Sequence, residues 1–173
     1  ALGGDLEAFV LQAAPRNLFK KSTVVLTAGE TAMFKLADKI PDGTVLGARG
    51  MHGVFAAASE LNKWFRGAYQ DRYQLPPVYP AYHMAQAILG TKAAYEKAQA
   101  ANGGNAPNQD QIIAAFENLT FEAPSGKVQM SLGKGHQAVQ ATAYGTTKLV
   151  KGQITLTNVK SYPAEKVNPP EGV

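Results

Sequence analysis

The first five residues, Ala1-Leu2-Gly3-Gly4-Asp5, have the pattern of a strand end that leads through a glycine turn into a helix. A domain does not ordinarily start at the end of a strand, so we expect this chain to be the later part of a larger unit. The pattern then repeats, because apolar runs at 23–27 and 44–47 alternate with helical segments at 6–14 and 31–38. This βαβαβ order predicts an α/β fold with a largely parallel sheet.

Each of the first two strand ends is followed by a carboxylate, Asp5 in the opening turn and Glu30 in the turn Thr27-Ala28-Gly29-Glu30-Thr31. Ligands of open α/β sheets bind beyond the carboxyl ends of the strands. The two acids therefore predict a ligand site at this edge. Simpler interpretations stay open: Asp5 also suits a helix N-cap, typically worth about 1 kcal/mol, and Glu30 also suits a solvated loop.

Composition limits the class of protein. The chain has 173 residues, 45% hydrophobic and 17% charged, which suits one ordinary domain or two small lobes. The net charge is +4, but the Lys and Arg residues are scattered, so we expect no nucleic-acid partner. The absence of cysteine excludes disulfides, a thiolate nucleophile and cysteine metal ligands. No stretch approaches the roughly 20 apolar residues of a membrane helix.

Long helical segments are expected in the middle of the chain, at 56–73, 80–101 and 108–119. The second would end at Asn102-Gly103-Gly104, and the third would have Asn108 as its N-cap. Their apolar faces predict that they cover a sheet. The large side chains expected in core or lobe packing are Trp64, Phe65, Tyr69, Tyr79, Tyr82, Met84 and Ile88.

The last third of the chain changes to strand patterns. We expect strands at 128–130, 139–144, 147–150 and 153–159. The last two would form a hairpin around the two-residue turn Lys151-Gly152.

Motifs of enzyme active sites are absent from the sequence. It has no nucleophile elbow, zinc-protease motif, phosphate-binding loop or dinucleotide fingerprint. The histidines, His52, His83 and His136, are far apart and have no carboxylate at metal-ligand spacing. We therefore predict no catalytic residue, metal or cofactor. A small α/β enzyme that uses Asp5 and Glu30 as an acid/base pair is the weaker alternative.

Short motifs occur in a characteristic order along the chain. They are Gly3-Gly4-Asp5-Leu6, Gly29-Glu30, Pro41-Asp42-Gly43, Trp64-Phe65, Tyr79-Pro80-Ala81-Tyr82, Pro124-Ser125-Gly126-Lys127-Val128-Gln129-Met130, Gly135-His136-Gln137-Ala138 and Tyr162-Pro163-Ala164-Glu165. In this order they resemble the C-terminal portion of a type I periplasmic solute-binding protein. The similar proteins are the branched-chain amino acid and amide receptors of ABC importers, the Leu/Ile/Val-binding protein family. The order is the specific signal, since no single motif is diagnostic.

The resemblance implies an architecture of two Rossmann-like lobes with three crossovers, of which this chain supplies the C-terminal part. The implied division is a second-lobe βαβαβ segment at 1–50, a crossover at 51–55, a first-lobe helical segment at 54–123, a crossover with the closing strands and hairpin of the second lobe at 124–160, and a Pro-rich tail at 161–173. The remainder of the first lobe would come from a missing N-terminal portion of the same protein.

The resemblance also implies a non-enzymatic function. The protein would be the substrate-binding component of an ABC importer, periplasmic or extracellular and membrane-anchored, and made with a signal peptide in its precursor. It would hold an amino-acid-like solute in the cleft between the lobes and present it to a membrane permease. A ligand-sensing regulatory domain of the same fold is the alternative, because fold does not fix function.

The implied binding residues follow from matching positions. Asp5, with Gly4 before it, stands where the second lobe faces the ligand, and Glu30 stands where amino-acid receptors pair with the α-ammonium group. Met51 and His52 follow the strand that leads to a lobe crossing and would line the cleft near the hinge. Packing in the hinge loop is the simpler interpretation for these two residues.

Overall fold

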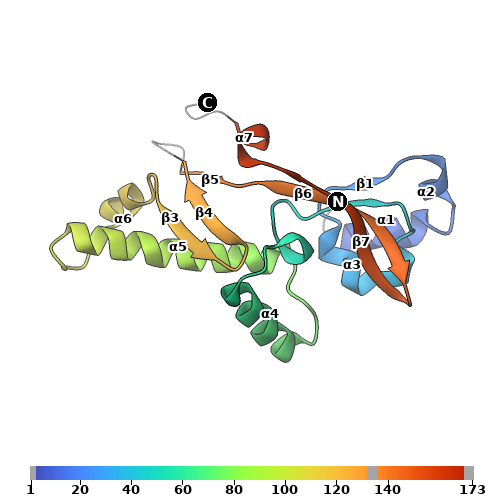
Figure 1. The fold of residues 1–173 in the computed structure, drawn as a ribbon, viewed down its shortest axis with the longest axis horizontal. Coiled ribbons are helices and arrows are strands. Elements are labelled where there is room, and N and C mark those ends of the chain that lie inside the picture. Colours follow the sequence, from blue (N-terminus) through green and yellow to red (C-terminus); the bar gives the residue numbers. More distant parts are fainter. Residues whose placement is uncertain (1–2, 132–135, 170–173) are drawn as a thin grey trace.

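The computed structural model describes residues 3–131 and 136–169, so the strand end expected at Ala1-Leu2 lies outside the described part. The strands form two separate sheets (Figure 1). The first has the order β1-β2-β6-β7, with β1 at Val25–Leu26, β2 at Val45–Gly47, β6 at Thr142–Val150 and β7 at Gln153–Tyr162. The second has the order β3-β4-β5, with β3 at Thr120–Ala123, β4 at Gly126–Met130 and β5 at Ala138–Val139.

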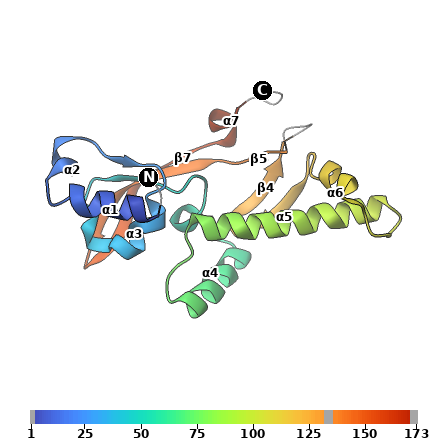
Figure 2. The same ribbon diagram turned by 180° about the vertical axis from the view of Figure 1, so that it is seen from behind.

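The helices are divided between the sheets. They are α1 (Gly4–Ala13), α2 (Leu18–Lys21), α3 (Glu30–Leu36), α4 (Glu60–Tyr73), α5 (Tyr79–Ala101), α6 (Gln109–Ala115) and α7 (Ala164–Val167), with 3-10 turns η1 (Ala37–Lys39) and η2 (Gly53–Phe55). In Figure 2, α1 and α3 lie in front of the first sheet, whereas α5 runs along the second. The α4 helix projects away from both.

The first sheet is mixed, not largely parallel. β1 and β2 are parallel as predicted, with Val25 opposite Val45, but β6 runs antiparallel to β2 and β7 antiparallel to β6. The predicted hairpin turn is confirmed at Lys151 and Gly152, whose φ angles are 50° and 77°. β6 is continuous from Thr142, so the separate strands expected at 139–144 and 147–150 are instead β5 and one long β6.

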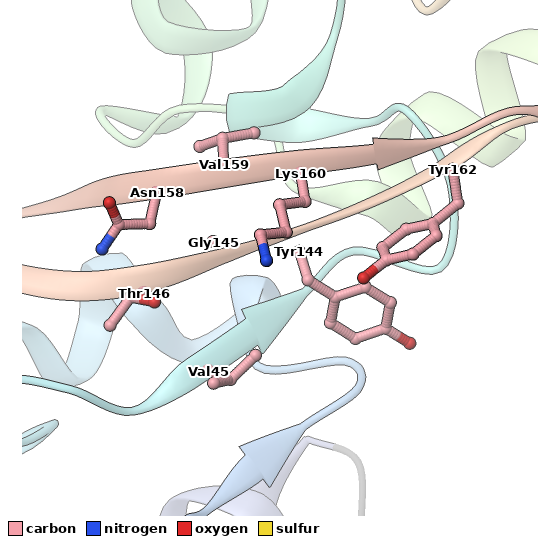
Figure 3. Close-up of a pocket in the computed structure, with 8 residues that line it drawn as sticks. All are labelled: Val45, Tyr144, Gly145, Thr146, Asn158, Val159, Lys160 and Tyr162. Atoms are coloured by element: carbon pink, nitrogen blue, oxygen red, sulfur yellow. The ribbon is translucent and has the colours of Figure 1, made fainter.

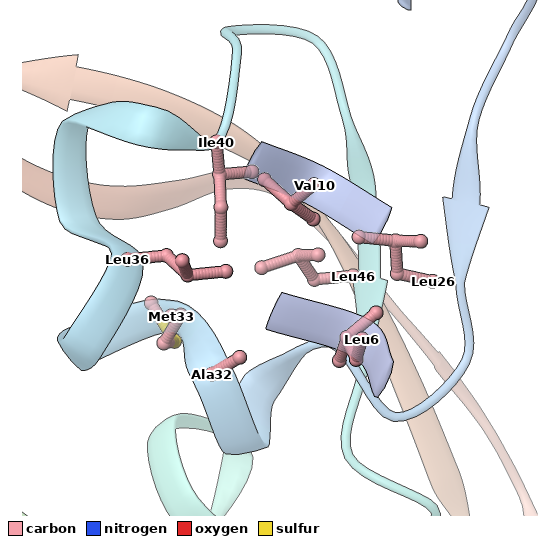
Figure 4. Packing of buried hydrophobic residues seen from close by; sticks show 8 residues of the cluster. All are labelled: Leu6, Val10, Leu26, Ala32, Met33, Leu36, Ile40 and Leu46. Atoms are coloured by element: carbon pink, nitrogen blue, oxygen red, sulfur yellow. The ribbon is translucent and has the colours of Figure 1, made fainter. Parts of the chain in front are cut away.

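A hydrophobic core joins α1 and α3 to one face of the first sheet (Figure 4). Leu46 of β2 lies at its centre with no exposed surface, and the cluster also contains Leu6, Val10, Leu26, Ala32, Met33, Leu36 and Ile40. Lys35 Nζ and Glu7 Oε2 form an ion pair at 2.6 Å between α3 and α1. Burial of this apolar stripe is what holds the two helices on the sheet.

The buried face of α5 has Tyr79 and Tyr82 in its first turn and small or amide side chains, from Gln86 to Ala98, along the rest of the helix. Gly90, Ala94 and Ala98 are buried, and a β-carbon at Gly90 would lie 2.9 Å from the ring of Phe121 in β3. The helix therefore approaches the second sheet closely through small residues. The inward positions expected for Met84 and Ile88 are wrong, because both side chains are 62% exposed.

The expected burial of the α4 aromatics holds only in part. Trp64 is 67% exposed, which contradicts the expected core position. Phe65 packs edge-on against the buried Tyr82 ring, with centroids 5.0 Å apart. The helix begins at Glu60 behind the N-cap Ser59, four residues later than predicted.

The strands β3 and β4 form one hairpin, in which Phe121 lies opposite Val128. Residues 124–130 therefore belong to the same sheet as the strand before them, and they lie against α5. The chain does not return to the first sheet until it passes between β5 and β6, at 140–141. The lobe boundary expected at 124 stays a prediction, and the hairpin favours a later position for it.

The α6 helix begins with the predicted cap. Asn108 Oδ1 accepts a hydrogen bond from the Gln111 amide at 2.9 Å, and Gln111 Oε1 accepts one from the Asn108 amide at 2.8 Å. This capping box satisfies two amides that the helix itself leaves unpaired.

Replacing Asn108 with alanine is expected to destabilise α6 by about 1 kcal/mol, which raises the local opening of the helix about fivefold. Hydrogen exchange of the α6 amides measures this directly. Gln109→Ala is the matched control, since Gln109 is exposed at the adjacent position. Equal protection in the two variants would contradict the capping role.

Candidate functional site

The chain passes twice between the two sheets within the described residues, at 48–59 after β2 and at 140–141 before β6. Apolar residues of the first passage pack in one cluster with Ala143, which lies two residues after the second passage. The cluster consists of Ala28, Ala48, Phe55, Tyr79 and Ala143, with Met51 and Leu156 against it. We call the region formed by Glu30, residues 49–53 and Tyr79–His83 the junction. Three of the five predicted site residues, Glu30, Met51 and His52, belong to it.

Glu30 is the first residue of α3 and has no exposed surface. Its Oε2 accepts a hydrogen bond from the Tyr79 amide at 2.9 Å, at the N-terminus of α5. A helix N-terminus has unpaired amides and a partial positive charge, so it favours a carboxylate there. The other oxygen, Oε1, has no partner of good hydrogen-bond geometry within residues 3–131 and 136–169.

Burial raises the pKa of Glu30 from 4.5 to about 7. The amides of Tyr79 and Val54 and the charge of Arg66 act in the opposite direction but do not overcome the loss of solvation. A carboxyl group in this state is partly neutral at pH 7.

Gly53 covers the unpaired oxygen of Glu30. A β-carbon at Gly53 would lie 1.7 Å from Oε1, and the residue has φ +56°. Both the contact and the left-handed backbone require glycine at this position. The Glu30 carboxyl is therefore sealed by the first passage between the sheets.

His52 is the second buried ionisable group of the junction, and it has no exposed surface. Its Nε2 lies 2.9 Å from Nε2 of His83 on α5, so one ring donates the hydrogen bond and the other accepts it. Nδ1 of His52 has no partner in the described part of the chain. Burial lowers the pKa of His52 to about 4, with a further lowering from His83.

Gly50 makes room for this imidazole. It has φ +143°, and a β-carbon there would lie 2.4 Å from His52 Nε2. Two glycines of the same passage, Gly50 and Gly53, thus close over two buried ionisable side chains.

Side chains of α4 connect the same region to a third element. The Tyr82 hydroxyl donates to Asn62 Oδ1 at 2.8 Å, and Arg66 Nη1 donates to the Gly53 carbonyl at 3.3 Å. Burial raises the pKa of Tyr82. The junction therefore joins α3, the first passage, α4 and α5.

The remaining predicted site residues lie at the start of α1. Gly4 is its first residue and is exposed, as is Asp5 in the first turn. The N-cap expected at Asp5 is wrong: Gly3 occupies that position with φ 55°, and the Asp5 side chain makes no capping hydrogen bond in the described structure. Glycine fits here because its backbone adopts positive φ without strain. A ligand role for Asp5 or Gly4 stays a prediction.

Sequence reasoning missed Gly53, Tyr79 and His83 as parts of this site. The sequence did contain one usable signal, the two glycines that flank Met51-His52. The sequence contained no signal for the pairing of Glu30 with Tyr79 or of His52 with His83, because these partners are separated along the chain by 49 and 31 residues.

A groove lies elsewhere, on the face of the first sheet opposite α1 and α3 (Figure 3). Its volume is about 580 Å³, and its walls include Val45, Tyr144, Thr146, Lys160 and Tyr162. It contains none of the predicted site residues. A groove of about 440 Å³ along α5 includes His83, and one of about 410 Å³ beside α1 includes Asp5.

Residues 3–131 and 136–169 contain no cluster of three or more His, Cys, Asp or Glu side chains arranged to hold a metal ion. None of their helices combines the length and apolar character needed to cross a bilayer.

Comparisons with known proteins identify a family and a fold. The family model described as "Periplasmic binding protein" matches residues 1–153. A search of curated protein sequences gives no match.

Solved structures of similar fold include a solute-binding protein of an ABC transporter from Rhodopseudomonas palustris BisB5 in complex with 3,4-dihydroxybenzoic acid. It has a TM-score of 0.71 and 24% identity, with 94% of this chain and 43% of that chain covered. A second from R. palustris HaA2, in complex with p-hydroxybenzoic acid, has a TM-score of 0.70 and 16% identity, covering 94% and 43%. A leucine binding protein from Thermotoga maritima MSB8 has a TM-score of 0.66 and 15% identity, covering 89% and 42%.

These likenesses confirm the predicted α/β fold of a type I periplasmic binding protein. The chain spans less than half the length of each of these structures.

Proposed function

We infer a transport function from the premise that this chain belongs to the periplasmic binding protein family. The protein acts as the substrate-binding component of an ABC importer, holds a small solute between two lobes and presents it to a membrane permease in the periplasm. The observation that carries this proposal is the family match over residues 1–153. The similar structures, described as solute-binding proteins of ABC transporters, support it.

In this proposal the chain supplies the second lobe and part of the first. The division into two sheets joined by two passages supports the separation. Residues 1–50 and the hairpin of β6 and β7 form the second-lobe part, and residues 54–139 form the first-lobe part. The rest of the first lobe comes from a further portion of the same protein, as its structural relatives are more than twice as long as the region they share with this chain.

The proposed solute is an amino acid or a related small amide or carboxylate. Glu30 Oε1 is the oxygen left free for an ammonium group, and a shift of the passage at Gly53 would expose it. Asp5, exposed at the start of α1, adds a second acid, with the Gly4 backbone beside it. Met51 and His52 lie in the adjacent passage. The relatives described with hydroxybenzoic acids make aromatic acids part of the same test.

Calorimetry of the complete protein against amino acids, amides and aromatic acids tests this function. If the solute carries an ammonium group, Glu30→Ala is expected to weaken binding by about 1.5 to 3 kcal/mol, or about 10- to 150-fold, because a charge-assisted hydrogen bond is lost. Glu122→Ala is the control, because Glu122 is exposed on β3.

If none of these solutes binds saturably, the transport function is contradicted. Binding that Glu30→Ala leaves unchanged would remove only the proposed role of Glu30. The 173 residues alone are expected to bind weakly or not at all, because they form less than half of the fold of the relatives.

A further inference from the structure

Glu30 connects the two sheets by a hydrogen bond that uses only one of its oxygens. Oε2 accepts from the first amide of α5, and Oε1 lies against Gly53 with no hydrogen bond of good geometry among the described residues. The nearby Val54 amide favours the ionised carboxyl but does not overcome the effect of burial. A buried carboxylate is stable when it is paired or fully hydrogen-bonded, and it takes up a proton when it is neither. The junction as built therefore favours the neutral carboxyl group.

The surrounding ionisable groups do not change this preference. Arg66 of α4 is the cation that faces Glu30, but its Nη1 is engaged by the Gly53 carbonyl, and no ion pair joins it to Glu30 within the described ranges. Tyr82 from α5 faces the carboxyl as a neutral phenol. From the first passage and α5, His52 and His83 bind one another, and Arg49 lies near His83.

We propose that closure of this junction is coupled to the uptake of a proton by Glu30. In the closed junction Glu30 is neutral, accepts the Tyr79 amide and is sealed by Gly53. When the passage at 49–53 moves and water reaches the carboxyl, Glu30 ionises and the open form is stabilised. The proposal concerns the hinge of the proposed receptor, but it depends on the burial of Glu30 and not on which solute is bound.

The direction of the pH effect follows from the pKa of Glu30, which is about 7 in the closed junction against the usual 4.5. The closed form binds more protons than the open form between these values. Its advantage is complete below pH 4.5 and is lost as the pH rises to 7. His52 acts in the opposite sense, because its pKa is lowered to about 4 and its burial favours the closed form above pH 6.5.

Because the pH effect of His52 opposes that of Glu30, the two contributions must be separated by comparing variants. In Glu30→Gln the amide oxygen can accept the Tyr79 amide, and the side chain does not titrate, so only the histidines respond to pH. The opening constant of the wild type divided by that of Glu30→Gln thus isolates the contribution of Glu30. The matched control is Glu122→Gln, at an exposed acid of β3.

The experiment is hydrogen exchange of the Tyr79 amide in the complete protein at pH 6 and pH 8, expressed as protection factors. The opening constant of the wild type, divided by that of Glu30→Gln, is expected to rise about tenfold between the two pH values. The same ratio for Glu122→Gln is expected to stay constant. A constant ratio for Glu30→Gln would overturn the proposal.

A second measurement applies if Glu30→Gln does not fold. Carbon-13 NMR titration of the wild-type carboxyl groups is expected to show Glu30 with a midpoint near 7. A midpoint near 4.5 would overturn the proton coupling, whether or not the protein binds a solute. Failure of solute binding with a Glu30 midpoint near 7 would instead contradict the transport function alone.

Discussion

Replacing Gly53 with alanine is expected to lower the free energy of unfolding by about 2 to 4 kcal/mol. Two effects add at this position. The backbone has φ +56°, which costs a residue with a β-carbon about 1 to 2 kcal/mol. The new methyl group would also overlap Glu30 Oε1, so the carboxyl must move and the hydrogen bond from the Tyr79 amide is strained or lost.

Urea unfolding of the wild type and variant measures the change. Gly103→Ala is the matched control, because Gly103 has φ +63° but open space around it in the described structure. Gly103→Ala therefore introduces the backbone strain of a positive φ angle without the steric contact that Gly53→Ala makes with Glu30. Equal losses for the two variants would mean that the contact between Gly53 and Glu30 is unimportant. Adding Glu30→Ala to Gly53→Ala should recover part of the loss, because the smaller side chain makes room.

Replacing Leu46 with alanine is expected to have an effect of similar or larger size, about 2 to 5 kcal/mol. Leu46 has no exposed surface and lies where α1 and α3 meet β2 (Figure 4). A β-carbon at Gly29 would approach its Cδ2 to 2.3 Å, so the neighbouring turn is already in close contact with it. Alanine leaves a cavity that this tight surrounding structure fills poorly.

The urea midpoint again gives the measurement, with Leu149→Ala as control. Leu149 is a leucine of the same sheet, but its side chain is 39% exposed. Its replacement should cost less, because more than a third of its surface already contacts solvent and its removal leaves no closed cavity. If both leucines cost the same, the core does not lie where the cluster around Leu46 indicates.

The sequence predicted elements best where local signals agree. Asn108 before an apolar segment, Lys151-Gly152 between strand patterns and Asn102-Gly103-Gly104 after a long helix each mark a boundary through short-range backbone chemistry. The structure has α6, the β6–β7 hairpin and the end of α5 at these places. Residues close together in the sequence are sufficient to determine such features.

The face of α5 was predicted incorrectly because hydrophobicity is a poor guide to close packing. Met84 and Ile88 are the most apolar choices, yet Gly90 and Ala94 are the residues that allow β3 to approach. The requirement comes from the Phe121 ring, a partner 31 positions away from Gly90 in the chain. No periodicity within the helix contains that information.

The candidate site was predicted only as a set of strand-end residues. Glu30, Met51 and His52 do meet at the junction, as expected of loops at one edge of a sheet. The burial of Glu30 and His52 was not foreseen, because it depends on α5 and on Gly50 and Gly53 closing over them. Asp5 remains exposed beside α1, and its role stays a prediction.

The two passages between the sheets have a mechanical consequence. They lie close together, since Ala48, Met51 and Phe55 of one pack in the same cluster as Ala143, which lies two residues after the other. Two adjacent tethers suppress twisting and sliding of the joined bodies far more than rotation about the line between them. A rotation of one sheet relative to the other would therefore bend both passages at the place where Glu30 contacts Gly53 and the Tyr79 amide.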